Sequence, residues 1–296
     1  MRTRGLRLSI IMFVLFLFVS EGSGAQPSIL GDIKASTAYI FIKSQEGFIP
    51  RGTGFFVGLK IPSKPKSFVL CLVTAKHVLC RPGTTQFVDT VYLRLNKKGG
   101  GAELAAIPIK SQGKDKTLFM HSDVSVDLAA IPMLPDQKKY DFRFIPEQLI
   151  LSKTSSANLS SYEGFEVFFP SLFSPYPGSG DMHPCVRFGR FALITDEKII
   201  WQGKPTAMYL IDTGSRGANS GAPVFFYADT GSGPAGQSAL KLAGILQGTF
   251  GNTSQEITEG NKTPRAFSST GIAAVIPAYK LHELLFGDEM KKKRGF

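Results

Sequence analysis

The segment GANSGAPVF, residues 217–225, places Ser220 in a turn of small residues directly before an apolar strand. Small neighbours let a carbonyl group approach a hydroxyl closely, and consecutive backbone N–H groups in such a turn can point at a developing oxyanion. Ser220 is therefore a candidate nucleophile. The alternative is an ordinary glycine-rich β-turn, because small residues also gather in turns for conformational reasons.

A serine hydroxyl needs a base to take its proton, and His77 has the best setting among the four histidines. It follows an apolar strand in the segment LVTAKHVL, residues 72–79, so its imidazole would lie at the edge of a rigid sheet. His121, His183 and His282 lie in polar, proline-adjacent or helical contexts, which favours surface positions for them.

A carboxylate can hold the tautomer of a histidine base, and Asp127 is the candidate for that role. It lies at the entrance to an apolar strand, where an unpaired carboxylate would be costly to bury, so we expect it to have a partner. Asp123 is the second candidate. For both residues the simpler interpretation is an aspartate that caps a turn.

Short apolar runs rich in Val, Ile, Phe and Tyr alternate with Gly, Pro, Ser and Asn along the chain, which predicts an all-β protein. The runs form two groups on either side of a polar connector at 135–161. The expected strands are 37–43, 53–59, 68–74, 90–95, 103–109 and 128–133 in the first group, and 165–169, 186–195, 207–211, 222–227, 242–250 and 271–276 in the second. A short helix is expected at 278–286.

The order His77, Asp127, Ser220 resembles that of the trypsin-like, or chymotrypsin-fold, serine peptidases. The resemblance covers roughly residues 36–286 and is closer to bacterial and glutamyl-endopeptidase-like members than to digestive ones. The segments that carry it are GTGFFV at 52–57, TAKHV at 74–78, DLA at 127–129, NSGAPV at 219–224, LAGI at 242–245 and GIAAVIP at 271–277.

This resemblance implies two six-stranded antiparallel β-barrels with the active site in the cleft between them. Ser220 would attack the scissile carbonyl, His77 would act as general base and then general acid, and Asp127 would orient His77. The backbone N–H groups of Ala218 and Ser220 would form the oxyanion hole. The implied activity is a serine endopeptidase that works through an acyl-enzyme on peptide or protein substrates, without a cofactor.

Three positions depart from the family pattern. Ala218 stands where glycine is usual two residues before the nucleophile, and its Cβ resists a positive φ, so its peptide could be flipped away from the oxyanion site. Gly221-Ala222 replaces a more usual pair of glycines. Asn219 replaces the aspartate that pairs with a freed N-terminus in digestive relatives, so that mode of activation is not expected. The alternative function is thus an impaired homologue that binds peptides or protein partners.

The sequence gives less information about specificity. Gly214, six residues before Ser220, is not the aspartate that selects basic side chains, so cleavage after Lys or Arg is not supported. The segments that could line a substrate pocket contain Gly214, Arg216, Gln247, Thr249 and either Ser269 or Thr270. Arg216 could select a polar or acidic side chain, or could simply be an exposed loop residue.

The N-terminus reads as a cleavable signal peptide, because three arginines precede a short apolar run and a small-residue stretch that ends at Ala25. A secreted or periplasmic protein is expected. The expected organisation is a signal peptide at 1–25, an N-terminal segment at 26–35, a first barrel at 36–150, a second barrel with the helix at 151–286, and a basic tail at 287–296. No PDZ-like domain is expected after residue 286.

The net charge is +11, part of which comes from the tail Lys291–Arg294. This tail could contact an anionic surface, although a solvated terminus is commoner, and no specific nucleic-acid binding is expected because basic and aromatic residues are not interleaved. Histidines and cysteines lack the spacing of a metal site. Cys71 and Cys80 could form a disulfide or remain buried thiols, whereas Cys185 has no obvious partner.

Overall fold

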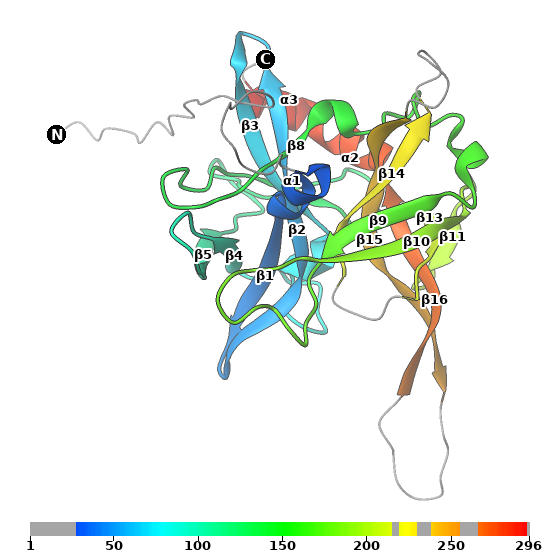
Figure 1. The fold of residues 1–296 in the computed structure, drawn as a ribbon, viewed down its shortest axis with the longest axis horizontal. Helices are drawn as coiled ribbons and strands as arrows, with labels where there is room; N and C mark the ends of the chain where they lie inside the picture. Colours follow the sequence, from blue (N-terminus) through cyan, green and yellow to red (C-terminus); the bar gives the residue numbers. More distant parts are fainter. Residues whose placement is uncertain (1–27, 215–218, 230–237, 255–265, 295–296) are drawn as a thin grey trace, which may run out of the picture.

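A computed structural model describes residues 28–214, 219–229, 238–254 and 266–294 (Figure 1). The predicted fold class is confirmed: the described chain is mainly β-structure, with a closed six-stranded barrel, a further sheet and short helices at the C-terminal end. The signal peptide predicted at 1–25 lies outside the described residues. None of the described helices is long and apolar enough to cross a membrane.

The first half of the chain forms an eight-stranded sheet with the order β5-β4-β1-β2-β3-β7-β6, to which β8 adds by pairing with β2. Except for the parallel β2–β8 pair, neighbouring strands are antiparallel. The elements are α1 (Ile29–Ala35), β1 (Thr37–Ser44), β2 (Gly47–Ile61), β3 (Lys64–Thr74), the 3-10 turn η1 (Lys76–Leu79), β4 (Thr90–Asn96), β5 (Ala102–Pro108), β6 (Phe119–Met120), β7 (Ala129–Pro132) and β8 (Ile145–Pro146).

The second half closes into a barrel with the strand order β10-β13-β16-β15-β14-β9. Along the paired stretches, closure removes the strand edges that would otherwise be free to pair with other chains. Its elements are the 3-10 turns η2 (Glu147–Leu149) and η3 (Leu159–Tyr162), followed by β9 (Glu166–Ser171), β10 (Cys185–Leu193), β13 (Tyr209–Asp212), β14 (Pro223–Asp229), β15 (Ser238–Ser254) and β16 (Ala266–Pro277).

Alternating burial explains why the sequence forms half-buried strands. In β4, Val91, Leu93 and Leu95 are buried, whereas the residues between them are partly exposed. One large hydrophobic cluster contains side chains from both halves, including Phe55 and Phe225. Burying a side chain of that size stabilises the fold by about 1.5–3 kcal/mol, so the shared cluster fixes the two halves together.

A separate hairpin, β11 (Ile199–Trp201) and β12 (Lys204–Thr206), forms a two-stranded sheet of its own beside the barrel. Its two-residue loop has positive φ angles at Gln202 and Gly203, the geometry that joins antiparallel strands tightly. Neither of these two strands was predicted from the sequence.

Two C-terminal helices follow the barrel, α2 (Ala278–Leu285) and α3 (Asp288–Arg294). The first confirms the predicted short helix. The second occupies most of the segment predicted as a basic tail. Arg294 is buried there, and its guanidinium donates to the carbonyl of Lys60 at 2.7 Å and contacts Glu147 at 3.4 Å.

Candidate active site

His77 and Asp127 meet at the end of β3. The Nδ1 atom of His77 lies 2.5 Å from Oδ2 of Asp127, and the backbone N–H of His77 donates to Oδ1 of the same carboxylate at 3.1 Å. The His77 side chain is 45% exposed and the Asp127 side chain 16%. With the Asp127 carboxylate accepting a hydrogen bond from Nδ1–H, Nε2 is left as the basic nitrogen of a half-exposed ring.

The second candidate, Asp123, caps a turn instead of contacting His77. Its Oδ1 atom accepts hydrogen bonds from the backbone N–H and the hydroxyl of Ser125, at 2.9 and 2.7 Å. Lys76 holds the same loop against η1, because its Nζ donates to the carbonyl of Val124 and its backbone N–H donates to the carbonyl of Asp127. The loop that carries Asp127 is therefore fixed by hydrogen bonds near both of its ends.

The turn that carries Ser220 is fastened to β15 by two backbone hydrogen bonds. Gly221 N–H donates to the carbonyl of Leu246 at 2.7 Å, and Leu246 N–H donates to the carbonyl of Ala222 at 2.9 Å. Gly221 has φ of +86°, and a Cβ there would lie 2.0 Å from the carbonyl oxygen of Thr53. Only glycine fits this position, for both conformational and steric reasons.

Gly52 and Thr53 of β2 bring the two halves of the site together. Thr53 N–H donates to the carbonyl of Ser220 at 2.9 Å. A Cβ on Gly52 would lie 2.7 Å from that same carbonyl and 2.9 Å from a methyl group of Val78, the residue after His77. The Ser220 turn and the residue after His77 are thus both packed closely against Gly52.

The hydroxyl of Ser220 points toward β15. It donates to the backbone carbonyl of Gln247 at 3.0 Å, and within the described residues no hydrogen bond joins it to the His77 ring. The structure therefore brings together the three residues predicted for catalysis, but in this state the serine hydroxyl and the imidazole are not paired. Their catalytic roles remain predictions.

The predicted pocket residues are only partly described. Gln247 is 6% exposed, and its Oε1 atom has no hydrogen-bond partner in the described part of the chain. Gly214 is exposed and Thr249 is half-buried. Arg216 and Ala218, one of the two predicted oxyanion donors, lie outside the described residues.

One aromatic residue at this site was not predicted from the sequence. The indole ring of Trp201 lies over Gly248, the residue after Gln247, so that a Cβ at Gly248 would be 3.1 Å from Cζ2. The ring also makes an edge contact with Phe250, with 4.7 Å between the ring centroids. The signal that could have revealed the hairpin is Gln202-Gly203 between two short strand-forming runs.

The prediction that His121 is a surface residue is wrong. Its side chain is 4% exposed, its Nε2 lies 2.8 Å from Oε2 of Glu283, and its Nδ1 accepts from the backbone N–H of Asp123 at 3.0 Å. A backbone N–H can only donate, so Nδ1 carries no proton and Nε2 donates to Glu283. The polar residues Ser122 and Asp123 that follow His121 therefore do not mark a surface position.

The three cysteines are free: Cys71 and Cys80 are buried, and Cys185 is exposed. Cys71 and Cys80 are therefore buried thiols and do not form the disulfide that the sequence also allowed. Burial raises the pKa of Cys71 to about 12 despite the opposing charge of Arg294. No group of three or more metal-binding side chains occurs in the described ranges.

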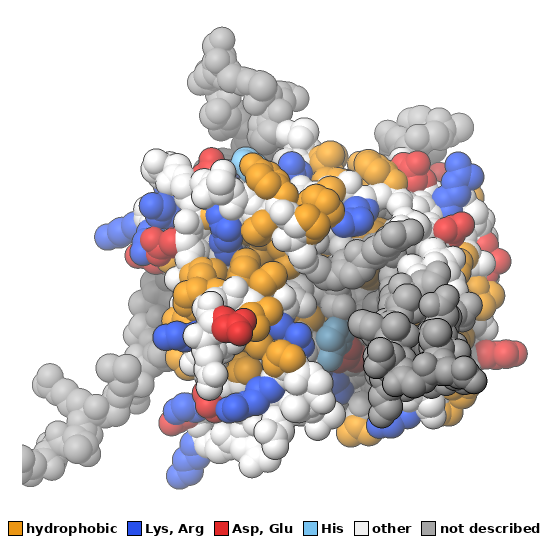
Figure 2. Space-filling view, turned by 90° about the horizontal axis from the view of Figure 1, so that it is seen from below, with side chains coloured by type: hydrophobic (Ala, Val, Ile, Leu, Met, Phe, Trp, Pro, Cys, Tyr) orange, Lys and Arg blue, Asp and Glu red, His pale blue; other side chains and the backbone are white. Residues whose placement is uncertain are grey.

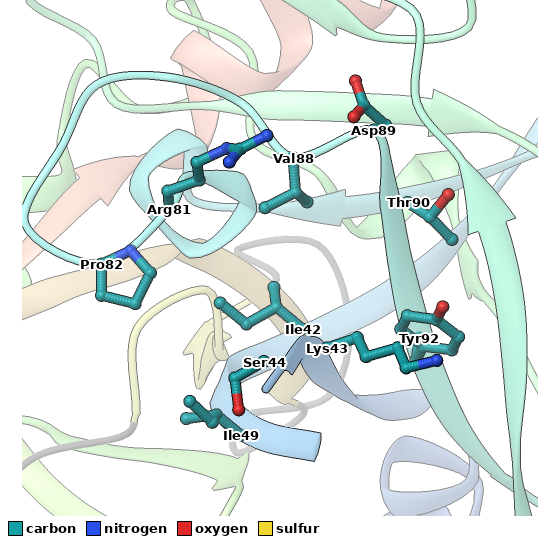
Figure 3. A pocket seen from close by; sticks show the side chains of 10 residues that line it. All are labelled: Ile42, Lys43, Ser44, Ile49, Arg81, Pro82, Val88, Asp89, Thr90 and Tyr92. Atoms are coloured by element: carbon teal, nitrogen blue, oxygen red, sulfur yellow. The ribbon is translucent and has the colours of Figure 1, made fainter. Parts of the chain in front are cut away.

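A groove of about 450 Å³ lies on the first half of the molecule, close to the His77 turn. Figure 3 shows Arg81, Pro82 and Val88 facing Ile42 and Ile49 across it. On the face drawn in Figure 2, hydrophobic patches are likewise bordered by lysine and arginine side chains. The groove is connected to the site through the chain itself, because Arg51, two residues after Ile49, donates to the carbonyl of His77 at 3.3 Å.

No protein-family model and no curated protein matches this sequence. Among solved structures, the chain is similar to the MamO protease domain from Magnetospirillum magneticum, with 12% identity and a TM-score of 0.49 over 86% of this chain and 98% of that one. It is also similar to the catalytically active tobacco etch virus protease in complex with product, with 14% identity and a TM-score of 0.43 over 94% of this chain and 89% of that one.

Proposed function

We propose that this chain is a serine endopeptidase in which Ser220, His77 and Asp127 hydrolyse peptide bonds through an acyl-enzyme. The observation that carries the proposal is the contact between Nδ1 of His77 and Asp127, made beside the turn that carries Ser220. A peptide or protein is the expected substrate, and no cofactor is required. The resemblance found in the sequence adds to this support.

The proposed reaction begins when the Ser220 hydroxyl turns from the carbonyl of Gln247 to Nε2 of His77. Nε2 takes the hydroxyl proton as Oγ forms a bond to the scissile carbonyl carbon. The imidazolium, stabilised by Asp127, then gives that proton to the leaving nitrogen as the C–N bond breaks. Water hydrolyses the resulting ester by the same two steps, which restores Ser220.

An impaired homologue that binds peptides is the second candidate function. The observation that favours it is the hydrogen bond from Ser220 to the carbonyl of Gln247, which leaves the hydroxyl unpaired with the base. Ala218, at a position where a glycine is usual in peptidases of this kind, also favours this candidate.

A fluorophosphonate probe separates the two candidates, because it reacts only with an activated serine. We expect one adduct on Ser220 by intact mass and peptide mapping, and none in the Ser220→Ala and His77→Ala variants. Asp127→Asn should slow labelling by up to about 10,000-fold, because an amide no longer fixes the required histidine tautomer. A folded protein that stays unlabelled at Ser220 rules out the active peptidase.

We also propose that the protein is secreted or periplasmic and is cleaved after Ala25. The arginine-flanked apolar run and the small residues before the cleavage position support this proposal. Expression in a secreting host followed by N-terminal sequencing of the exported protein tests it. A mature chain that begins at Gln26 is expected, and retention of Met1 in the exported protein contradicts it.

A further inference from the structure

The β11–β12 hairpin reaches both sides of the candidate site. On one side, Trp201 covers Gly248 of β15. On the other side, Lys204 of the hairpin and Lys198, the residue before it, lie close to the loop that holds Asp127: the charge of Lys198 lowers the pKa of Asp123, and the charge of Lys204 lowers that of Lys76. Burial lowers the pKa of Lys76 and the charge of Lys204 lowers it further, against the opposing effect of Asp127.

The strand under Trp201 has an unpaired edge where a peptide could bind. Pairing of β14 with β15 ends at Pro223 and Ile245, whereas β16 continues to pair with β15 through Gly248 and beyond. In the described part of the chain, the β14 side of β15 therefore has no strand partner from Gln247 onward. Ser220 lies on that side, with its hydroxyl on the carbonyl of Gln247. An extended peptide commonly adds to such an edge by backbone hydrogen bonds.

We propose that Trp201, lying on Gly248, forms a hydrophobic subsite for an aromatic or large aliphatic side chain on the acyl side of the scissile bond. The proposal rests on the proposed function, because it places the reacting peptide at Ser220. It names the substrate class as peptides with such a side chain within about three residues before the cleaved bond, since each extended residue spans about 3.3 Å along β15.

The acyl side follows from the roles of the two halves of the site. His77 must protonate the leaving nitrogen, so the leaving segment passes along the first half of the molecule, where the groove of about 450 Å³ lies beside the His77 turn. The segment of the peptide on the acyl side then lies along the second half of the molecule, which contains Ser220 and β15. Trp201 is the large aromatic side chain that covers the first residue of β15 beyond Gln247.

The subsite is apolar because the indole of Trp201 packs on Gly248, which has no side chain of its own. A side chain at Gly248 would occupy the space that the indole fills, because its Cβ would be only 3.1–3.3 Å from two indole carbons. Trp201 as a whole is half-buried, and its ring contacts Gly248 and Phe250. An open indole face binds apolar and aromatic groups.

The test uses the fact that Trp201 is the chain's single tryptophan, so intrinsic fluorescence reports on this position alone. Acetylated hexapeptide amides built from alanine and glycine, each with one Phe, Leu, Lys or Glu at a chosen position, are titrated into the Ser220→Ala variant, which cannot turn them over. We expect the Phe and Leu peptides to shift the Trp201 emission and to bind at least about tenfold more tightly than the all-alanine peptide. Absence of any emission change with these peptides overturns the proposal.

Variants of the hairpin provide the second measurement. Dye-labelled versions of the same peptides, followed by anisotropy, should lose the preference for Phe and Leu in Trp201→Ala and keep part of it in Trp201→Phe. Ile200→Ala is the matched control, because Ile200 is 60% exposed on the neighbouring position of the same strand. An unchanged preference in a folded Trp201→Ala variant overturns the proposal.

Failure of this proposal can be told apart from failure of the proposed function. Selective peptide binding without fluorophosphonate labelling would reject hydrolysis but keep the Trp201 subsite. Labelling of Ser220 together with cleavage that is indifferent to Trp201→Ala would keep hydrolysis but reject the subsite.

Discussion

The carboxylate of Glu283 in α2 lies 2.8 Å from Nε2 of His121, the buried histidine at the base of the loop that leads to Asp127. Lys280 donates to the same carboxylate at 2.9 Å. The C-terminal helix therefore supports the first half of the molecule at the segment on which the candidate site depends.

This contact predicts a pH-dependent stability. Burial alone would raise the pKa of Glu283, but the hydrogen bonds from Lys280 and His121 outweigh it and lower the pKa below its usual value. A lowered pKa stabilises the fold above the unfolded-state value of about 4.3, and this contribution is lost as the pH falls through the folded-state pKa. Glu283→Gln should be less stable than wild type in urea unfolding at pH 7.

The same measurement near pH 3 provides the control for this prediction. The difference between Glu283→Gln and wild type should shrink there, because the stabilisation that comes from a lowered pKa declines once the pH falls below the unfolded-state value. A difference that is the same at both pH values would mean that the charge of Glu283 does not contribute.

Alanine substitutions at two glycines with nearly equal φ distinguish the cost of a steric clash from the cost of backbone strain. Gly221 and Gly113 have φ of +86° and +87°, but a Cβ at Gly221 would lie 2.0 Å from the carbonyl oxygen of Thr53, whereas Gly113 has open space. Gly113→Ala should cost about 1 kcal/mol, and Gly221→Ala about 3 kcal/mol or more. Thermal unfolding of both variants tests this, and equal costs would mean that the close approach to Thr53 is not maintained in solution.

Arg294 should contribute far more to stability than the other basic residues of α3. Its guanidinium is buried on the carbonyl of Lys60 and the carboxylate of Glu147, whereas Lys292 is exposed. Arg294→Gln leaves the carbonyl of Lys60 and the largely covered carboxylate of Glu147 without the buried charge that pairs with them, and should cost about 3 kcal/mol. Lys292→Gln should change the free energy of unfolding by less than about 0.5 kcal/mol. Similar small effects in both variants would show that α3 is frayed.

Thiol reactivity should distinguish the buried cysteines from the exposed one. Cys185 is exposed, whereas burial raises the pKa of Cys71 to about 12. At pH 8 a maleimide should modify Cys185 rapidly and reach Cys71 only after unfolding, as mass spectrometry can follow. Because the folded-state pKa of Cys71 is raised, its contribution to stability is present below about pH 8.5 and falls progressively toward pH 12. Rapid native labelling of Cys71 would contradict the buried position.

The strands and the meeting of His77 with Asp127 could be predicted because both depend on local pattern. An apolar run that ends in TAKHV and another that begins after Asp127 form paired neighbours, β3 and β7, so the two residues fall at the same edge of the sheet. Periodicity and order along the chain are sufficient for such an inference.

Other features depend on contacts between distant segments, which no local pattern encodes. His121 is followed by the polar residues Ser122 and Asp123, yet it is buried against Glu283, which lies 162 positions further along the chain. Trp201 lies in a hairpin whose two strands have three residues each, which is too short for a periodic signal. Its neighbour Gly248 is 47 positions away along the chain. The direction of the Ser220 hydroxyl is a choice between side-chain rotamers, which the sequence does not determine.

The two-stranded β11–β12 sheet lies outside the strand order of the closed barrel. Because the β11–β12 hairpin contributes no strand to the closed barrel, the hairpin that carries Trp201 can be lengthened, shortened or replaced without changing the pairing of the barrel strands. If Trp201 forms the proposed subsite, selectivity and stability depend on different parts of this chain. Exchange of residues 199–206 is the simplest route by which a lineage, or an engineer, could give the same scaffold a new preference.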